Sequence, residues 1–345
     1  MILMGINCNT GVKKKIVTLF YRKNRYTGNF SIEASFDRMM KEFPEGTGFE
    51  LRKIVISHFS NGLLPRLQGI MEARRYETKI NHVTGDVHYL VFGLRGKNTI
   101  LTIHDCGLMS HSNPVIRKLL KWFWLDLPVW HCRYITAVSE ATRQEIINYT
   151  GCMPGKVVVI PTVISSHFRP VTRKFNSKCP RILHIGLAPN KNFQRHVEAI
   201  SGLECSIHII GKLEKYHEDI LNKFAVRYSY EYNLSDKQMQ QAYAESDILL
   251  FASTLEGFGM PIIEAQTVGI PVVTSNLSSM PEVAGNGACL VDPYDIESIR
   301  DGLSRIIGDA DYRSKLISEG VSNIERYSAE RISRMYYELY KKVAP

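Results

Sequence analysis

The stretch Asp247-Ile-Leu-Leu-Phe251, together with the nearby Glu256-Gly-Phe-Gly-Met-Pro-Ile-Ile-Glu264, decides how this chain folds. The apolar run 247–251 is suited to a buried parallel strand, and Pro261 is well placed as the first residue of a helix. Gly257 and Gly259 can adopt backbone angles closed to other residues, so amides near the turn can converge on an anion that the helix N-terminus also favours. Strand, glycine turn and helix in this order predict a phosphate-binding element.

Two carboxylates flank this glycine turn. A carboxylate beside a phosphate repels it, so Glu256 and Glu264 need other partners, and an ionised Glu can only accept hydrogen bonds. A ligand with hydroxyl-rich rings on both sides of a diphosphate would offer donors to both, and a nucleotide sugar has that shape. Alternatively, Glu264 complements the helix dipole and Glu256 is a solvated loop residue. On these residues alone both interpretations stay open.

Short apolar runs alternate with helical patterns along the rest of the chain. Strands are predicted at 16–20, 54–56, 99–103, 134–138 and 157–160, with helices near 31–41, 62–75, 114–124 and 140–149. After a polar stretch the alternation restarts, with strands at 181–185, 206–210, 247–251 and 271–274. This succession predicts an α/β fold of two doubly wound, Rossmann-like domains that face a central cleft.

The expected domains are residues 1–165, a linker at 166–179, a second domain at 180–325 and a C-terminal helix at 326–345 that can cross back to the first domain. In such sheets, ligands lie beyond the carboxyl ends of the strands. Candidate functional residues are therefore His104-Asp105, residues 186–192 and Ser139-Glu140, although Ser139 suits a helix cap better.

Charge and cysteine usage narrow the class of protein. The chain has 345 residues and a net charge of +9, and residues 1–165 hold 22 Lys and Arg against 12 Asp and Glu. Such a basic half suggests an anionic partner, which could be a membrane surface, an acidic acceptor or nucleic acid. Seven scattered cysteines show no metal or disulfide spacing, and neither a membrane span nor a signal-peptide core is visible. We expect a cytoplasmic protein with reduced cysteines.

Over nearly its whole length the chain resembles the retaining glycosyltransferases of family 4, which share the two-domain GT-B architecture. The most specific resemblance is to the family's donor-binding core, in residues 251–265, Gly269-Ile-Pro-Val-Val273, Pro281-Glu-Val283 and Leu290-Val-Asp-Pro293. Weaker matches are Gly186 with Lys191-Asn192, Ile103-His-Asp105, residues 136–140 and residues 156–161.

The resemblance implies specific roles in a cleft for a nucleotide sugar. Glu264 would hold the ribose, Glu256 the hydroxyls of the transferred sugar, and Lys191 the diphosphate charge that grows as the glycosidic bond breaks. Backbone around the remaining donor-site residues would approach the diphosphate: Gly257, Phe258, Gly259, Met260, Gly28 and Gly186. His104 would sit across the cleft near the reacting centre, unless it is an ordinary buried histidine. The resemblance implies no divalent metal, no other cofactor and no enzymic nucleophile.

Two positions depart from the family pattern. Many members have Arg or Lys directly after the glycine that corresponds to Gly186, whereas this chain has Leu187, so Arg195 or Lys212 could supply the missing charge. The N-terminal loop often holds Gly-Gly in the family, and this chain has only Gly28 there.

The N-terminal domain binds the acceptor in this family, and the basic surplus lies there. Residues 114–124 combine apolar residues at helical spacing with the basic residues Arg117, Lys118 and Lys121. Together with the aromatic residues Trp122, Trp124 and Trp130, this composition suits a membrane interface, or else an ordinary core helix with a solvated basic face. Further positive charge comes from Arg66, Arg74 and Arg75. We expect an anionic membrane surface and a saccharide or lipid-linked saccharide acceptor as partners.

The sequence therefore predicts a retaining, metal-independent hexosyltransferase that uses a UDP-sugar or GDP-sugar, peripheral on the inner face of the cell membrane, in envelope polysaccharide synthesis such as O-antigen or capsule. Residues 230–234 are the candidate nucleobase contacts. One alternative is a sugar-nucleotide epimerase of the same architecture. The other is a nucleic-acid-binding protein, for which no recognition motif is visible.

Overall fold

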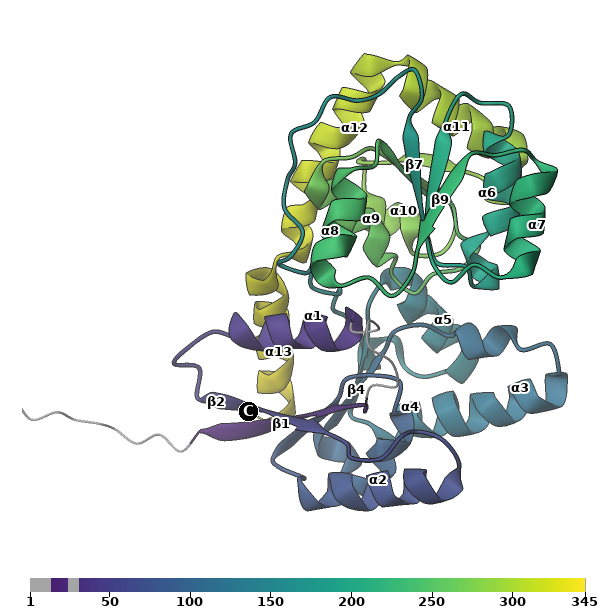
Figure 1. Cartoon of the computed structure of the whole chain (residues 1–345). Coiled ribbons are helices and arrows are strands. Elements are labelled where there is room, and N and C mark those ends of the chain that lie inside the picture. The colour runs from purple at the N-terminus through teal and green to yellow at the C-terminus, as the bar shows by residue number, and fades with distance from the viewer. Residues whose placement is uncertain (1–13, 24–30, 345) are drawn as a thin grey trace, which may run out of the picture.

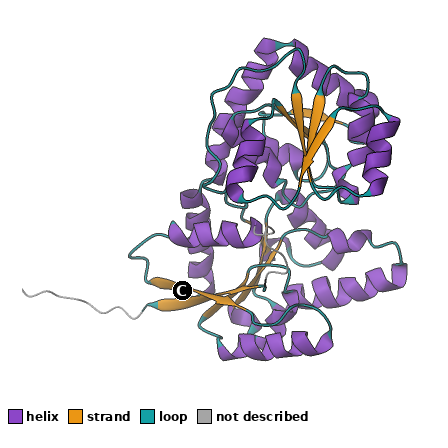
Figure 2. Ribbon diagram, viewed as in Figure 1, coloured by secondary structure: helices purple, strands orange, loops and turns teal. Residues whose placement is uncertain are grey.

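The computed structural model describes residues 14–23 and 31–344, and its core is two parallel six-stranded sheets (Figures 1 and 2). The first sheet has the order β2-β1-β3-β4-β5-β6, with β1 (Lys15–Tyr21), β2 (Phe49–Val55), β3 (Ile80–Val83), β4 (Thr99–Ile103), β5 (Tyr134–Ala137) and β6 (Val157–Val159). The second has the order β12-β11-β10-β7-β8-β9, with β7 (Arg181–Ile185), β8 (Ser206–Ile210), β9 (Tyr228–Glu231), β10 (Ile248–Phe251), β11 (Val272–Ser275) and β12 (Cys289–Val291).

Helices cover both sheets. Around the first lie α1 (Ser31–Lys41), α2 (Leu63–Arg75), the 3₁₀ segment His88–Gly93, α3 (Pro114–Leu120), a π-helical segment (Lys121–Asp126), α4 (Leu127–His131) and α5 (Glu140–Thr150). Around the second lie α6 (Phe193–Ile200), α7 (Lys215–Lys223), α8 (Asp236–Ala244), α9 (Met260–Val268), α10 (Met280–Ala284), α11 (Ile296–Gly308) and α12 (Ala310–Asn323). The last helix is α13 (Ala329–Val343). The expected pair of doubly wound sheets is present.

The central strands are apolar because helices bury both faces of a parallel sheet. Every residue of β4 and of β10 is buried, which is why both could be predicted from short apolar runs. The sequence did not predict β3, β9 or β12. In β3 the polar pair Asn81-His82 interrupts the apolar pattern, and β9 is an edge strand whose four residues are all exposed.

The chain passes from the first sheet to the second through residues 160–180, which contain no helix or strand. It returns through α13, which packs against the first sheet (Figure 1). The Tyr340 hydroxyl lies 2.9 Å from Nδ1 of buried His82, and the Ser333 hydroxyl donates to the Met39 carbonyl at 2.8 Å. The C-terminal helix thus completes the core of the first half of the molecule.

The two halves meet at the glycine turn between β10 and α9. The carbonyl of Gly257 accepts hydrogen bonds from the hydroxyls of Ser139, at 2.7 Å, and Thr142, at 3.0 Å. A Cβ atom on Gly257 would clash with the backbone carbonyl of His104. Beside this contact, the Glu282 carboxylate of α10 accepts from the Glu140 amide at 2.8 Å, at the N-terminus of α5. The sheets are therefore held together through backbone at the edge where β4, β5 and β10 end.

No helix in the described ranges, 14–23 and 31–344, is long and apolar enough to cross a bilayer.

Replacing Gly257 with Ala tests the contact between the halves. Its Cβ would overlap the His104 carbonyl, so we expect the halves to separate, with a larger radius of gyration in small-angle X-ray scattering and a loss of about 1–3 kcal/mol in unfolding free energy. Gly155→Ala is the matched control, because its Cβ meets nothing within 4 Å, and should change stability by less than about 0.5 kcal/mol. An unchanged radius in Gly257→Ala would show that the contact does not hold the halves together.

Candidate functional site

The turn after β10 has amides for which no acceptor is found among the described residues. Gly259 has a φ of 99°, as expected for a glycine-specific turn, and α9 begins at Met260, one residue before the predicted Pro261. Gly257 does not have a positive φ, so that part of the prediction was wrong, and the close approach of His104 explains this glycine instead. Phe258 is buried and packs edge-on against Tyr327.

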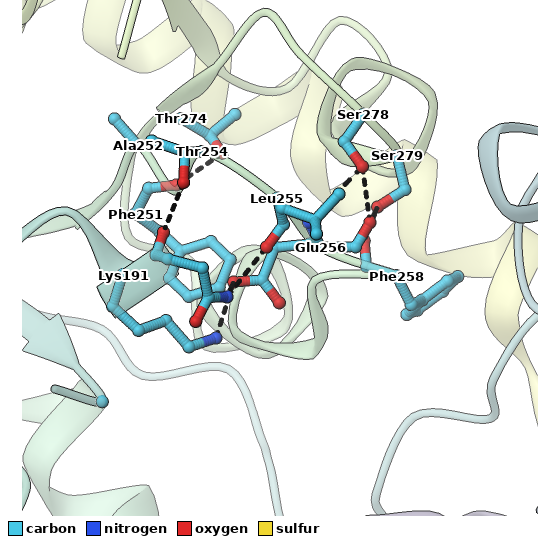
Figure 3. A network of polar contacts seen from close by, with 12 residues as sticks. Lys191, Phe251, Ala252, Thr254, Leu255, Glu256, Phe258, Thr274, Ser278 and Ser279 are labelled. Carbon is cyan, nitrogen blue, oxygen red and sulfur yellow. Dashed lines mark hydrogen bonds and ion pairs between the residues drawn. The ribbon is translucent and has the colours of Figure 1, made fainter. Parts of the chain in front are cut away.

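Hydroxyls from the β11–α10 connection fix the carbonyls of this turn (Figure 3). Ser278 and Ser279 donate to the Glu256 carbonyl at 2.6 and 2.9 Å, and Ser279 also lies 2.8 Å from the Phe258 carbonyl. Within the described part of the chain, no partner accepts a hydrogen bond from the four amides of residues 257–260. Four unused amides at a helix N-terminus form a site for an anion.

The side chain of Glu256 lies against Lys191 at the mouth of this turn. Their Oε1 and Nζ atoms are 2.6 Å apart, and both side chains are mostly buried (Figure 3). The Lys191 stem packs on Gly186, whose φ is 85°, and its ammonium lies 4.7 Å from the Phe251 ring centroid. An incoming anion would thus meet a neutral ion pair beside the amides and not a bare carboxylate.

Glu264 lies one turn into α9, so it does not complement the first turn of the helix. The Tyr243 hydroxyl donates to its Oε2 at 2.6 Å. Burial raises the pKa of Glu264 to about 7; the Tyr243 hydrogen bond acts in the opposite direction, and the charge of Asp236 adds to the rise. Tyr243 comes from α8, and the sequence analysis missed it because nothing in its local pattern marks it as more than a core residue.

His104 follows β4 and lines a cavity of about 660 Å³ on the first-sheet side. Its Nε2 donates to the Thr84 carbonyl at 2.8 Å, and its ring packs where Gly85 has no Cβ. His104 is therefore both hydrogen-bonded and open to the cavity. The other lining residues are Arg22, Lys23, Ser60, Arg66, Asp86, Val87, His88, Asp105, Gly107, Leu108, Leu120 and Trp124.

The remaining predicted donor-site residues have different positions. Leu187 packs into the second core and against Gly211, so no cation stands directly after Gly186. Arg195 donates to Asn192 at 3.0 Å and lies over the Tyr294 ring, whereas Lys212 is exposed. Gly28 lies outside the described residues.

The predicted basic helix is split in two. Regular helix α3 ends at Leu120, and the π-helical segment continues with Lys121 paired to Asp126 at 2.7 Å. Arg117, Lys118 and Trp122 are exposed, but Trp124 turns inward and lines the cavity. The helix is thus partly core and partly surface, and contact of its exposed face with a membrane stays a prediction.

The structure shows exposed apolar side chains on α2, which the sequence analysis did not identify, and on the predicted basic helix, where it did expect apolar residues. On α2, the side chains of Leu63, Leu64, Leu67 and Met71 are 46–74% exposed. On α3 and the π-helical segment, Val115, Ile116, Leu119 and Trp122 are 42–67% exposed. Only the arginines of α2 had been noted from the sequence.

Among the residues that the structure describes, no three His, Cys, Asp or Glu side chains are grouped to hold a metal ion. The chain contains one Asp-x-Asp sequence, Asp309-Ala310-Asp311, but Asp309 caps α12 by accepting from the Tyr312 amide at 2.9 Å. Metal independence stays a prediction.

Comparison with known proteins agrees with this geometry. Residues 171–322 match the family model described as glycosyl transferases group 1, and residues 41–168 match the one described as Glycosyltransferase Family 4. O-antigen chain mannosyltransferase B of Escherichia coli is 26% identical over 304 residues, which cover 81% of this chain and 78% of that protein. O-antigen chain mannosyltransferase RfbU of Salmonella typhimurium is 26% identical over 252 residues, covering 69% of this chain and 68% of that protein.

A solved structure shares the fold. Anabaena Alr3699/HepE, crystallised in complex with UDP and glucose, superposes with a TM-score of 0.74 at 14% identity, over 95% of this chain and 100% of that chain. The GT-B arrangement expected from the sequence is confirmed.

The Tyr243–Glu264 hydrogen bond makes a prediction about pH. Ribose hydroxyls need an ionised acceptor, so the affinity for UDP or GDP should fall up to about tenfold per pH unit below the Glu264 pKa of about 7. Tyr243→Phe removes the hydrogen bond that favours the ionised form, so it should move this midpoint to higher pH and weaken binding several-fold at neutral pH. Calorimetric titrations across the pH range measure both effects.

The diphosphate of the nucleotide titrates in the same pH range as Glu264, so Glu264→Gln serves as the control. The part of the pH dependence of binding that this variant lacks comes from Glu264. If Tyr243→Phe and the parent protein gave the same pH profile, the hydrogen bond would have no role in nucleotide binding.

Proposed function

Because this chain belongs to the family 4 glycosyltransferases, we propose that it moves a hexose, with mannose as the first candidate, from a nucleotide diphosphate sugar to a saccharide acceptor with retention of configuration. The observation that carries the proposal is the group of four unused amides at the N-terminus of α9, next to the Lys191–Glu256 pair. Mannose is suggested by the names of the two O-antigen relatives, and their names also suggest envelope polysaccharide assembly.

In the proposed complex the diphosphate lies on the amides of residues 257–260. Lys191 and these amides stabilise the negative charge that grows on the leaving diphosphate, and a fixed set of donors does so without reorganisation. Glu256 accepts from hydroxyls of the transferred sugar, and Glu264 accepts from the ribose. The departing phosphate oxygen takes the proton of the acceptor hydroxyl as the new glycosidic bond forms on the same face. The step then needs neither an enzymic nucleophile nor a metal ion.

Proximity to a membrane is a second part of the proposal. The exposed apolar side chains of α2 and α3 are interspersed with the exposed basic residues Arg74, Arg75, Arg117 and Lys118. An apolar face with a basic surround is suited to the interface of an anionic bilayer. The lining of the His104 cavity draws on the same two regions, through Arg66 on α2 and Leu120 on α3. We therefore expect the acceptor to reach the site from a membrane surface.

A binding and turnover experiment tests the transferase proposal. A thermal-shift panel of UDP-, GDP- and ADP-sugars should identify one donor by stabilisation. Glu264→Ala should weaken its binding about tenfold or more, whereas Glu256→Ala should lower turnover more than nucleotide affinity. Transfer is then measured by mass spectrometry of the acceptor product. Wild-type activity in both variants would sink the site assignment, and epimerisation of the donor without an acceptor would indicate an epimerase.

Vesicle sedimentation tests the membrane proposal. The protein should bind anionic vesicles in preference to zwitterionic ones, and binding should weaken with salt as the charges are screened. Leu63→Ser with Leu67→Ser should reduce binding about tenfold or more, since two exposed leucines would no longer enter the bilayer. Val321→Ser on α12, 46% exposed, is the matched control. Equal vesicle binding by the double variant and the control would rule out this surface.

A further inference from the structure

The walls of the His104 cavity carry two kinds of polar group. On one side are Asp86, Asp105, His88 and His104, which follow β3 and β4. On the other is Arg66 from α2, whose guanidinium carbon lies 5.0 Å from the Trp124 ring centroid. The Trp124 ring lies between Arg66 and the polar groups of the other side, because its centroid is also 5.8 Å from the centroid of the His88 ring.

Arg66 is the unusual member of this lining. Its Nε is buried and has no hydrogen-bond partner, and no carboxylate in the described residues pairs with its guanidinium. By contrast, the neighbouring Arg22 is bound to both Glu33 and Asp86. An unpaired buried donor on a charged group is unfavourable, and an anionic ligand that accepts from it would remove this cost. Arg66 thus lies over an aromatic ring, and no carboxylate of the described residues compensates its charge.

Lys23 is a second cation of the lining that has no carboxylate partner among residues 14–23 and 31–344. Its ammonium donates to the Ser57 carbonyl at 3.0 Å and lies 4.5 Å from the Phe59 ring centroid. Neither contact neutralises the charge. Two such cations match a phosphate monoester, which carries nearly two negative charges, better than they match a carboxylate.

The opposite side of the cavity offers acceptors for hydroxyl groups. Nδ1 of His88 donates to the Trp124 carbonyl at 2.7 Å, and burial lowers the pKa of His88, so at neutral pH its Nε2 carries a lone pair. The Asp105 carboxylate accepts one hydrogen bond, from the Gly107 amide at 2.8 Å, and retains capacity for more. Sugar hydroxyls can donate to both groups.

From this arrangement we propose that the acceptor is a saccharide that itself carries an anionic group, a phosphate ester in the first instance, with Arg66 as the residue that binds the anion. The sugar ring lies toward His88 and Asp105, and the phosphate lies on the Arg66 guanidinium over Trp124. The proposal rests on the proposed function, because it assigns the acceptor of the same reaction.

Direct titration of the full chain tests the proposal, with the donor site saturated by UDP or GDP. The probes are α-mannose 1-phosphate, methyl α-mannoside, glucuronic acid and inorganic phosphate. The phosphosugar should bind about tenfold or more tightly than the methyl glycoside, and Arg66→Gln should remove that difference. Arg66→Lys should restore part of it, and Arg52→Gln, at an exposed arginine on β2 that does not line the cavity, should leave it unchanged.

Each alternative result has a defined meaning. Equal binding of the phosphosugar and the methyl glycoside, or a preference that survives Arg66→Gln, would overturn the proposal. So would inorganic phosphate binding as tightly as the phosphosugar, since the cavity would then hold an anion without a sugar. Tighter binding of glucuronic acid would overturn the choice of a phosphate ester. Thermal melting confirms that the variants fold, and failure of UDP and GDP to bind counts against the proposed function instead.

Discussion

The close approach of the Gly257 backbone to the first half of the molecule is the constraint on which the site depends. Its carbonyl is held by the hydroxyls of Ser139 and Thr142, and its missing side chain makes room for the His104 carbonyl. Hydroxyls from both halves bond to the carbonyls of this turn, and its amides have no acceptor among the described residues. The same turn therefore forms the proposed anion site and the contact between the halves, so separating the halves would change both.

The pairing of Lys191 with Glu256 explains how a carboxylate could stand beside the proposed phosphate site. An unpaired Glu256 would repel a diphosphate, but the ammonium 2.6 Å away neutralises it and is itself available to a phosphate oxygen. A ligand that presents a phosphate and a hydroxyl together can satisfy both partners. Binding then replaces one charge-assisted contact with two, so the pair favours ligands that carry both groups over free phosphate.

The sequence predicted those parts of the fold and site that local patterns determine. The element from β10 to α9 is contiguous, and its strand, glycines and proline are specific signals. What could not be predicted depends on distant residues. The buried His82 ring of β3 has a hydrogen-bond partner on β4, Thr102, and a second one in Tyr340, which is 258 residues away. Likewise, Ser278 and Ser279 bond to the turn from another element, Tyr243 bonds to Glu264 from α8, and Leu187 packs against Gly211.

The two walls of the site differ in how strongly sequence determines their chemistry. On the second-sheet wall, the groups proposed to bind the anion are backbone amides. Their positions follow from Gly259 and the start of α9, so most substitutions would leave them in place. On the first-sheet wall, the polar side chains that line the cavity come from α2 and from the segments after β1, β2, β3 and β4. Side chains can be substituted without a change of fold, so their chemistry is less constrained than that of the amides. The donor class could therefore be proposed from a short motif, whereas the acceptor could be proposed only once Arg66, Trp124 and His88 were seen together.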